Sequence, residues 1–255
     1  MKKGVIISSI EEAKKIKDLT DAYLIPLNDL SINYPNTFSL EEIKEIKKLN
    51  KEIFIFINKN IENKELELLE KTLKKIDKLN IQGILFYDIA IVQLKKELNL
   101  KTDLVWAQEH LATNYSSVNY WYSKGAHYAY LSSEITKKEI EEIRKNTESK
   151  LMINVYGYIP MFTSKRHLVD NYEEAFNIKE KGNKIYKEGK YYNILDTKNG
   201  TTVYSDKILN IKERIDVDYI IYNSNMIDNI KDILENNNEE IETGFLYKET
   251  IYKVK

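Results

Sequence analysis

Cysteine is absent from all 255 residues of this chain. Disulfide bonds, zinc–thiolate sites, iron–sulfur clusters and cysteine nucleophiles all need that side chain. The sequence therefore excludes each of them within this chain, and we expect no cofactor. Histidine occurs only at His110, His127 and His167, so few other side chains could ligate iron.

Long apolar runs are also missing. A transmembrane helix needs about 20 consecutive apolar residues, and no run here reaches that length. The apolar stretch that follows Lys2 and Lys3 ends at Glu11 and Glu12, too early for a signal peptide. We expect a soluble cytoplasmic protein that does not associate with a membrane.

An excess of charge of either sign is lacking, with 39 basic and 40 acidic residues and a formal net charge of -1. The protein as a whole has no positive field that would favour binding of nucleic acid. A local basic patch is still compatible with this balance of charges. The HExxH and GxSxG motifs of zinc peptidases and serine hydrolases are missing too.

Short apolar segments alternate with stretches whose apolar residues recur at helical spacing. Residues 53–57, Ile-Phe-Ile-Phe-Ile, are apolar throughout, as in a strand of a parallel sheet covered on both faces. About eight such strand–helix units in about 250 residues predict a (β/α)8 TIM-type barrel. A doubly wound sheet is the alternative, although no Gly-rich dinucleotide loop follows the first strand.

A different pattern appears late in the chain. The pairs Glu188-Gly189 and Asn199-Gly200 separate strand-like runs, and Asn-Gly is a strong hairpin signal. We predict a small antiparallel β insertion over residues 184–204, within a single barrel domain of residues 1–255. A helix is expected over residues 208–215, and residues 245–254 are interpreted as a strand or an ordered extension.

Polar residues follow the predicted strands, where the active site of such a barrel lies. They are Asn28, Asp29, Asn58, Lys59, Tyr87, Asp88, Glu109, His110, Ser133, Glu134, Tyr156 to Pro160, Asn223 and Ser224. Asp88 with Glu134 could act as an acid–base pair. A metal site that adds Glu109 and His110 is conceivable, but neighbours on a strand point to opposite faces, so we predict no metal.

Residues 150–172 begin as a buried strand, break at Gly157 and Pro160, and then resume as a predicted helix with Ser164 as N-cap. The residues after this cap are Lys165, Arg166 and His167. The first N–H groups of a helix are unpaired and suit an anion. The plainer alternative is that Ser164 only caps the helix and Arg166 faces water.

Residues 156–172, YGYIPMFTSKRHLVDNY, resemble the signature of the collagenase-like peptidase family (peptidase family U, number thirty-two). The shared positions are Gly157, Ser164, Arg166, Leu168 and Tyr172. Other segments agree: ILFYD ends at Asp88, residues 112–136 contain Asn114 and Glu134, and residues 191–205 resemble the family's tyrosine-to-Gly-Thr hairpin. The resemblance covers nearly the whole chain.

The departures from this signature concern its cysteines, which are replaced here by Pro160 and His167, while a further cysteine pair is missing. Family members with the cysteines resemble iron–sulfur proteins, several of them tied to oxygen-independent hydroxylation of RNA or of ubiquinone precursors. One branch works on the wobble uridine of tRNA through two paralogous proteins, one of them short. This chain is similar to such a short paralogue.

Two functions are therefore expected from the resemblance. The chain is either a cluster-free partner subunit in tRNA wobble-uridine 5-hydroxylation, with a larger cysteine-bearing paralogue and tRNA as partners, or a free-standing peptidase or hydrolase acting at the barrel mouth. Whether it is itself an enzyme stays open. The expected catalytic residues are Asp88, Glu134 and Arg166. The expected substrate-binding residues are Asn114, Tyr156, Ser164, Lys165 and His167, with a small anion at the mouth.

Overall fold

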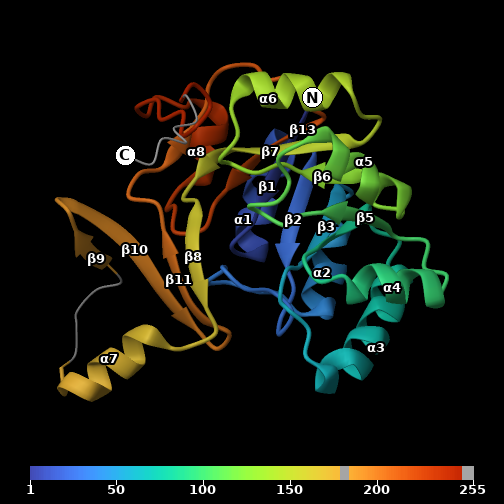
Figure 1. The fold of residues 1–255 in the computed structure, drawn as a ribbon, viewed down its shortest axis with the longest axis horizontal. Helices are drawn as coiled ribbons and strands as arrows, with labels where there is room; N and C mark the ends of the chain where they lie inside the picture. The colour runs from blue at the N-terminus through green and yellow to red at the C-terminus, as the bar shows by residue number, and fades with distance from the viewer. Residues whose placement is uncertain (179–183, 249–255) are drawn as a thin grey trace.

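Eight parallel strands form a closed barrel in the computed structural model, which describes residues 1–178 and 184–248 (Figure 1). The strands are β1 (Lys2–Ile6), β2 (Ala22–Pro26), β3 (Glu52–Ile57), β4 (Gly83–Phe86), β5 (Asp103–Trp106), β6 (Tyr128–Tyr130), β7 (Lys150–Gly157) and β13 (Tyr219–Asn223). They pair in the order β7-β13-β1-β2-β3-β4-β5-β6, and a β6–β7 pairing closes the ring. The predicted TIM-type barrel is confirmed, and the open sheet is wrong.

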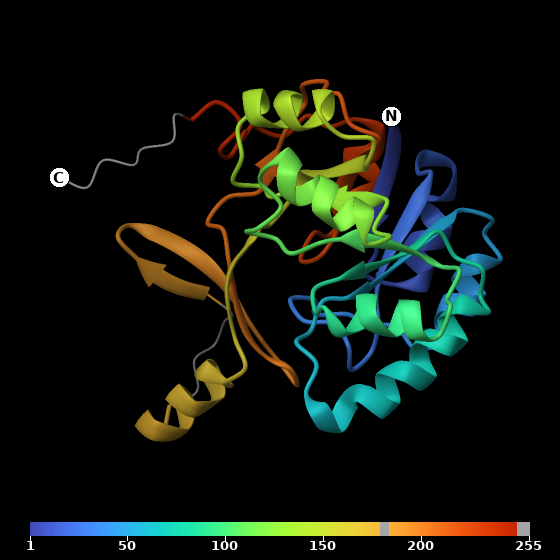
Figure 2. The same cartoon turned by 45° about the vertical axis from the view of Figure 1, so that its right-hand side comes forward.

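Helices cover the outside of this barrel (Figures 1 and 2). They are α1 (Ile10–Lys15), α2 (Leu40–Lys47), α3 (Leu66–Asp77), α4 (Ala90–Glu97), α5 (Tyr115–Ser123), α6 (Lys137–Lys145) and α8 (Ile230–Glu235), with 3-10 turns at Lys17–Leu19 and Asn63–Glu65. Side chains cap several of them: Ser39 and Glu42 form a capping box at α2. Among the described residues, no helix combines the length and apolar character that a bilayer crossing requires.

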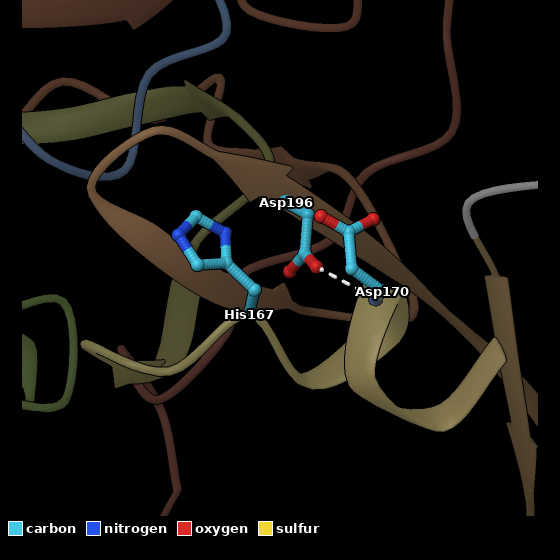
Figure 3. Close-up of side chains that lie close together, drawn as sticks. All are labelled: His167, Asp170 and Asp196. Atoms are coloured by element: carbon cyan, nitrogen blue, oxygen red, sulfur yellow. Dashed lines mark hydrogen bonds between the residues drawn. The ribbon is translucent and has the colours of Figure 1, made fainter. Parts of the chain in front are cut away.

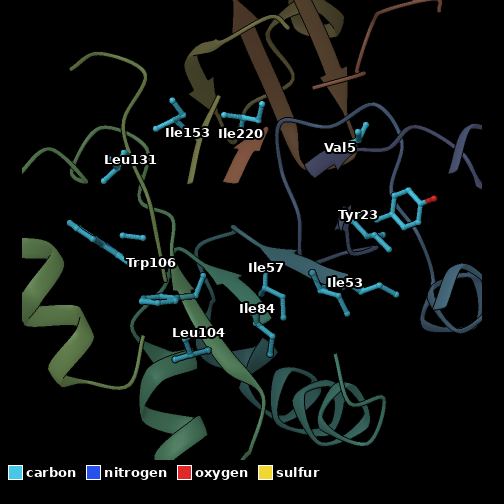
Figure 4. Close-up of a cluster of buried hydrophobic side chains, with 14 of the residues drawn as sticks. Val5, Tyr23, Ile53, Ile57, Ile84, Leu104, Trp106, Leu131, Ile153 and Ile220 are labelled. Atoms are coloured by element: carbon cyan, nitrogen blue, oxygen red, sulfur yellow. The ribbon is translucent and has the colours of Figure 1, made fainter. Parts of the chain in front are cut away.

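The core has two layers because successive side chains of a strand point to opposite faces. Ile53, Ile55 and Ile57 of β3 face the helices and join the outer cluster shown in Figure 4. Phe54 and Phe56 of the same strand fill the barrel interior. The sequence IFIFI is apolar at every position because both faces of this strand are buried.

The segment before β13 differs from the prediction. Residues 208–215 do not form a helix: Leu209–Asn210 is a short strand, β12, that pairs antiparallel with the end of β7. Ile211 N donates to Val155 O at 2.8 Å, so the backbone groups that a helix would use are bonded to β7 instead. The prediction of a helix was wrong because pairing with β7 outweighed the helical spacing of the apolar residues in this segment. Residues 244–247 form a turn, and 249–254 lie outside the described residues.

A second, antiparallel sheet stands beside the barrel (Figures 1 and 2). Its strands are β8 (Pro160–Ser164), β9 (Lys184–Lys187), β10 (Lys190–Thr197) and β11 (Gly200–Tyr204), in the order β8-β11-β10-β9. The helix α7 (Leu168–Phe176) lies between β8 and β9 in the chain. The sheet includes β8 and therefore begins before residue 184. The predicted N-cap at Ser164 was wrong, because Ser164 ends β8 and the helix begins only at Leu168.

Candidate functional site at the barrel mouth

A cavity of about 50 Å³ lies at the carboxyl ends of the barrel strands. Its polar lining consists of Asn58, Glu109, His110, Ser132, Ser133, Glu134, Asn154 and Asn223. Aromatic rings of Tyr34, Phe56 and Tyr130 form the apolar part of its wall. This volume suits a few waters or a small ligand and is too small for a nucleotide.

Glu109 is a carboxyl in this cavity whose pKa departs from its ordinary value. Burial raises the pKa of its carboxyl, and the nearby Glu134 carboxylate adds to this effect. His110 and a hydrogen bond from Asn33 Nδ2, at 3.5 Å from Glu109 Oε1, oppose the rise in pKa. Glu109 therefore keeps its proton to a higher pH than an ordinary glutamate and is able to donate it.

Asn33 connects this carboxyl to the antiparallel sheet. Its Oδ1 accepts hydrogen bonds from Thr163 of β8 and Thr202 of β11, both at 2.8 Å. Its backbone oxygen accepts from the buried Tyr204 hydroxyl at 2.7 Å. Asn33 adopts φ 68°, a left-handed conformation that asparagine tolerates well. The loop between β2 and α2 thus attaches the second sheet to the cavity wall.

The three predicted catalytic residues are not brought together. Asp88 accepts hydrogen bonds from Ile61 N and Ala90 N, both at 2.9 Å, and so connects the loop after β3 to the start of α4. Glu134 does line the cavity, with an oxygen 3.5 Å from His110 Nδ1. Arg166 is exposed in the segment between β8 and α7, outside the cavity lining.

Asn114 has a local structural contact. It is the N-cap of α5, and its side-chain oxygen accepts from Ser117 N at 2.9 Å. Asparagine is among the preferred N-cap residues, because its oxygen replaces a missing helical acceptor. The side-chain oxygen of Asn114, which was expected to bind substrate, is therefore bonded at the start of its own helix.

Tyr156 points away from the cavity. In the pairing of β7 with β13, Asn154 is opposite Ile221 and Tyr156 is opposite Tyr222, so one residue of β7 is bulged out. A bulge shifts the alternation of side chains and turns the next one to the other face. Burial raises the pKa of Tyr156, and its hydroxyl donates to Glu239 Oε2 at 2.6 Å in the outer layer.

Ser164 and Lys165 also make contacts of their own. Ser164 Oγ accepts from Arg166 N at 3.1 Å, which stabilises the turn after β8. Lys165 Nζ lies 3.5 Å from Glu62 Oε1, and its side chain is 61% exposed. This leaves the lysine largely in solvent, where a surface ion pair contributes little stability.

The start of α7 is already occupied by the protein's own acceptors. Val169 N and Asp170 N both donate to Asp196 Oδ2 at 3.2 Å, and Leu168 N donates to Thr201 Oγ1 at 2.7 Å. The sequence predicted an anion at a helix start placed directly after Ser164, whereas the helix start in the structure is at Leu168. Asp196, from β10, fills that position instead.

His167, Asp170 and Asp196 lie together beside this helix start (Figure 3). Their ligand atoms are within 4.8 Å of one another, which is the only such group found in the described part of the chain. Imidazole and carboxylate are ligands that zinc and manganese accept. Asp196 is accounted for by the hydrogen bonds that it accepts from α7, and the absence of a metal stays a prediction.

Glu109 is one of the polar residues that follow the predicted strands, but it is not among the catalytic or substrate-binding residues expected from the sequence. The signal available in the sequence was a carboxylate three positions after the buried Trp106, next to a histidine. That signal does not reveal the environment of Glu109, because the Asn33 side chain reaches this carboxyl only in the folded chain.

Comparison with known proteins identifies the family. The chain is 29% identical over 217 residues to "tRNA hydroxylation protein P2" of Bacillus subtilis (strain 168), covering 66% of this chain and 70% of that protein. The solved structure of the U32 peptidase Mk0906 has a TM-score of 0.58 and 12% identity, covering 88% of this chain and 92% of that one, and shares the fold. The sequence matches Peptidase family U32 over residues 12–240, which confirms the resemblance. The chain therefore belongs to peptidase family U32.

Proposed function

We propose that this chain is a cluster-free partner subunit in tRNA hydroxylation, acting on the wobble uridine together with a larger cysteine-bearing paralogue. The similarity to tRNA hydroxylation protein P2 is the observation that carries the proposal, since it extends over 66% of the chain. The chain has no cysteine, so thiolate-ligated iron–sulfur chemistry has to come from the paralogue. The proposal places the chain in the cytoplasm with its tRNA.

The role proposed for the mouth is binding and positioning. Its cavity presents side-chain amides and the Glu109 carboxyl, and the acidic and basic side chains in its lining are Glu109, Glu134 and His110. A small anion is disfavoured there because, within the described lining, two carboxylates stand without a lysine or arginine. We therefore assign the RNA phosphate contact to Lys165 and Arg166, which are exposed after β8.

A hydrolase acting at the mouth is the second candidate, and Glu109 favours it. A carboxyl with a raised pKa can protonate a leaving group, and His110 lies beside it. Asp88, however, is held by Ile61 N and Ala90 N, so the acid–base pair of Asp88 and Glu134 lacks support. The partner role agrees better with these contacts.

A genetic experiment tests the partner role. The gene is deleted in its native organism, and hydroxylated wobble uridine in total tRNA is measured by nucleoside mass spectrometry. We expect the modification to fall in the deletion strain and to return with the wild-type gene. Arg166→Ala is expected to restore it only in part. Arg214→Ala, which changes an arginine that is also exposed, is the matched control and is expected to restore it fully.

The same strains separate the two candidates. Unchanged modification in the deletion strain, together with cleavage of a peptide by the purified protein, would overturn the partner role in favour of the hydrolase. In that case Glu109→Gln is expected to abolish cleavage, because glutamine has no proton to donate at that position. An anaerobic pull-down followed by mass spectrometry identifies the paralogue, which a free-standing enzyme does not retain.

A further inference from the structure

An open groove on the outside of the barrel is lined by basic and aromatic side chains. It lies between α4 and α5, which follow the paired strands β4 and β5 and are therefore neighbours around the barrel (Figures 1 and 2). Its volume is about 770 Å³, far more than that of the cavity at the mouth. Lys95, Lys96 and Lys124 line it, together with the rings of Tyr120 and Trp121.

The charge of this groove is positive. Among the described residues, its lining contains three lysines and no acidic residue. The sequence accounts for this, since no aspartate or glutamate occurs between Glu109 and Glu134, a stretch that contains the whole of α5. One carboxylate is bonded to the groove wall, that of Glu97, which accepts from Gln93 Nε2 at 2.6 Å. Three ammonium groups outnumber it, so an anionic partner is favoured.

Two of the three lysines are available to a ligand. Lys95 is partly buried, and its Nζ donates to Thr102 O, so this lysine belongs to the wall of the groove. Lys96 and Lys124 are exposed, and neither forms an ion pair within the described part of the chain. A phosphate can therefore contact either ammonium group without displacing a carboxylate of the protein.

Aromatic rings stand next to these lysines. Tyr120 is 56% exposed, and Lys124 Nζ lies 5.4 Å from the centre of its ring. The ring of Trp121 is 5.3 Å from that of Tyr120. An exposed ring beside a cation suits a nucleotide, because the base stacks on the ring while the phosphate meets the ammonium group. An acidic peptide would need the lysines alone.

One end of the groove lies close to the phosphate contact proposed at Lys165. Lys165 Nζ is 3.5 Å from Glu62 Oε1, and the neighbouring Ile61 N donates to Asp88 at 2.9 Å. Asp88 precedes Ile89, which lines the groove at the start of α4. The two places are thus connected along one edge of the mouth, and one nucleic-acid strand can contact both.

We propose that the groove between α4 and α5 binds a single-stranded segment of RNA, with phosphates on Lys96 and Lys124 and a base stacked on Tyr120. Stacking needs unpaired bases, which the loops of a tRNA supply. The identity of this RNA as a tRNA rests on the function proposed above. The groove gives the RNA a binding surface outside the mouth, whose cavity is too small for a nucleotide.

Fluorescence of the purified chain during titration with a single-stranded oligouridylate locates the site. Trp106 is buried, whereas Trp121 lines the groove. We expect the oligouridylate to quench the emission of the wild type, because a base in the groove contacts Trp121. Trp121→Phe should lose this quenching and still bind the oligouridylate in a filter-binding assay. Binding by the wild type without quenching overturns the proposal.

Exchange of the lysines tests the phosphate contacts. In the double variant Lys96→Gln/Lys124→Gln, the slope of log affinity for the oligouridylate against log salt concentration should fall by about 0.7 for each lysine. The matched control is Lys75→Gln/Lys138→Gln, which removes the same charge from two exposed positions on α3 and α6 and should retain the wild-type slope. Thermal unfolding followed by circular dichroism confirms that both proteins fold. Equal slopes in all three proteins overturn the proposal.

Exchange of Tyr120 tests the stacking. Tyr120→Ser should weaken binding of the oligouridylate about tenfold. Tyr115→Ser is the control, because Tyr115 is exposed on the same helix but outside the groove lining, and it should bind like the wild type. Polyglutamate of equal length is the anion without bases. If it displaces the oligouridylate as well as unlabelled oligouridylate does, and Tyr120→Ser binds normally, the groove serves an acidic protein and the proposal fails.

Failure of this inference differs from failure of the proposed function. If hydroxylated uridine falls in the deletion strain while the groove variants bind the oligouridylate like the wild type, the groove is rejected and the function stands. If the groove variants lose binding while the deletion strain keeps its hydroxylated uridine, the groove is supported and the function is rejected.

Discussion

Thr202 Oγ1 donates a buried hydrogen bond of 2.8 Å to Asn33 Oδ1, joining residues that are 169 positions apart. Thr163 Oγ1 donates to the same oxygen at 2.8 Å, and Asn33 Nδ2 reaches Glu109 at 3.5 Å. One amide side chain therefore holds the second sheet against the barrel and contacts the carboxyl in the cavity. The position of the sheet and the environment of Glu109 are linked through Asn33.

Replacement of Asn33 tests this link. Asn33→Ala removes the acceptor of Thr163 and Thr202 and leaves a side chain that tolerates the left-handed conformation poorly. We expect the free energy of unfolding to fall by about 3 kcal/mol, of which about 1 kcal/mol comes from the backbone. Asn33→Gly is the matched control, since glycine adopts this conformation freely. Urea denaturation that finds no difference between the wild type and Asn33→Gly would contradict the role of the hydrogen bonds.

Glu109 should make stability depend on pH. Because burial raises its pKa above the ordinary 4.5, the folded chain binds this proton more tightly than the unfolded chain does. The stabilisation is complete below pH 4.5 and is lost as the pH rises through the folded pKa. As the pH rises from 4.5 through the folded pKa of Glu109, we expect the free energy of unfolding of Glu109→Gln to increase relative to that of the wild type. Above that pKa the difference between the two proteins should stay constant.

Urea denaturation of both proteins at a series of pH values measures this effect. Glu240→Gln removes an exposed carboxylate and serves as the control, for which no such growing advantage is expected. A difference between Glu109→Gln and the wild type that does not change with pH would show that the carboxyl titrates alike in the folded and unfolded chains.

Asp196 is expected to determine whether the first turn of α7 forms. Asp196→Ala removes the acceptor of Val169 N and Asp170 N, and loss of such a cap costs about 1–2 kcal/mol. Hydrogen exchange of these two amides should therefore accelerate by about tenfold. Asp196→Asn keeps a side-chain oxygen and should retain most of the protection. Equal exchange in Asp196→Ala and the wild type would refute the capping role.

Bound iron is predicted to be absent from the isolated chain, because no thiolate is available and the histidines are only three. Anaerobic purification followed by iron and acid-labile sulfide assays checks this prediction, and elemental analysis of the same sample detects zinc or manganese. Stoichiometric iron and sulfide would be incompatible with it. Stoichiometric zinc lost in His167→Ala would instead assign a metal to His167, Asp170 and Asp196.

The barrel could be predicted because local patterns and the global fold agree in most of the chain. Residues 53–57 are apolar at every position, and only a strand buried on both faces satisfies that pattern. Ser39 and Asn114 cap their helices as their sequence positions suggest. The predictions failed where pairing with a strand distant in sequence outweighed the local helical pattern. The segment of β12 pairs with β7 instead of forming a helix, and residues 160–164 pair with β11 instead of leading into a helix at Ser164.

The sequence by itself determined the barrel class, the absence of thiolate chemistry and the family, since these depend on composition, periodicity and short motifs. Tertiary structure alone decided which polar residues share the mouth. A one-residue bulge turned Tyr156 outward, Asp196 filled the start of α7, and the loop at Asn33 placed an amide beside Glu109. Each of these outcomes depends on a hydrogen-bond partner that only folding brings within reach. Such partners produce no periodic pattern in the sequence from which they could be predicted.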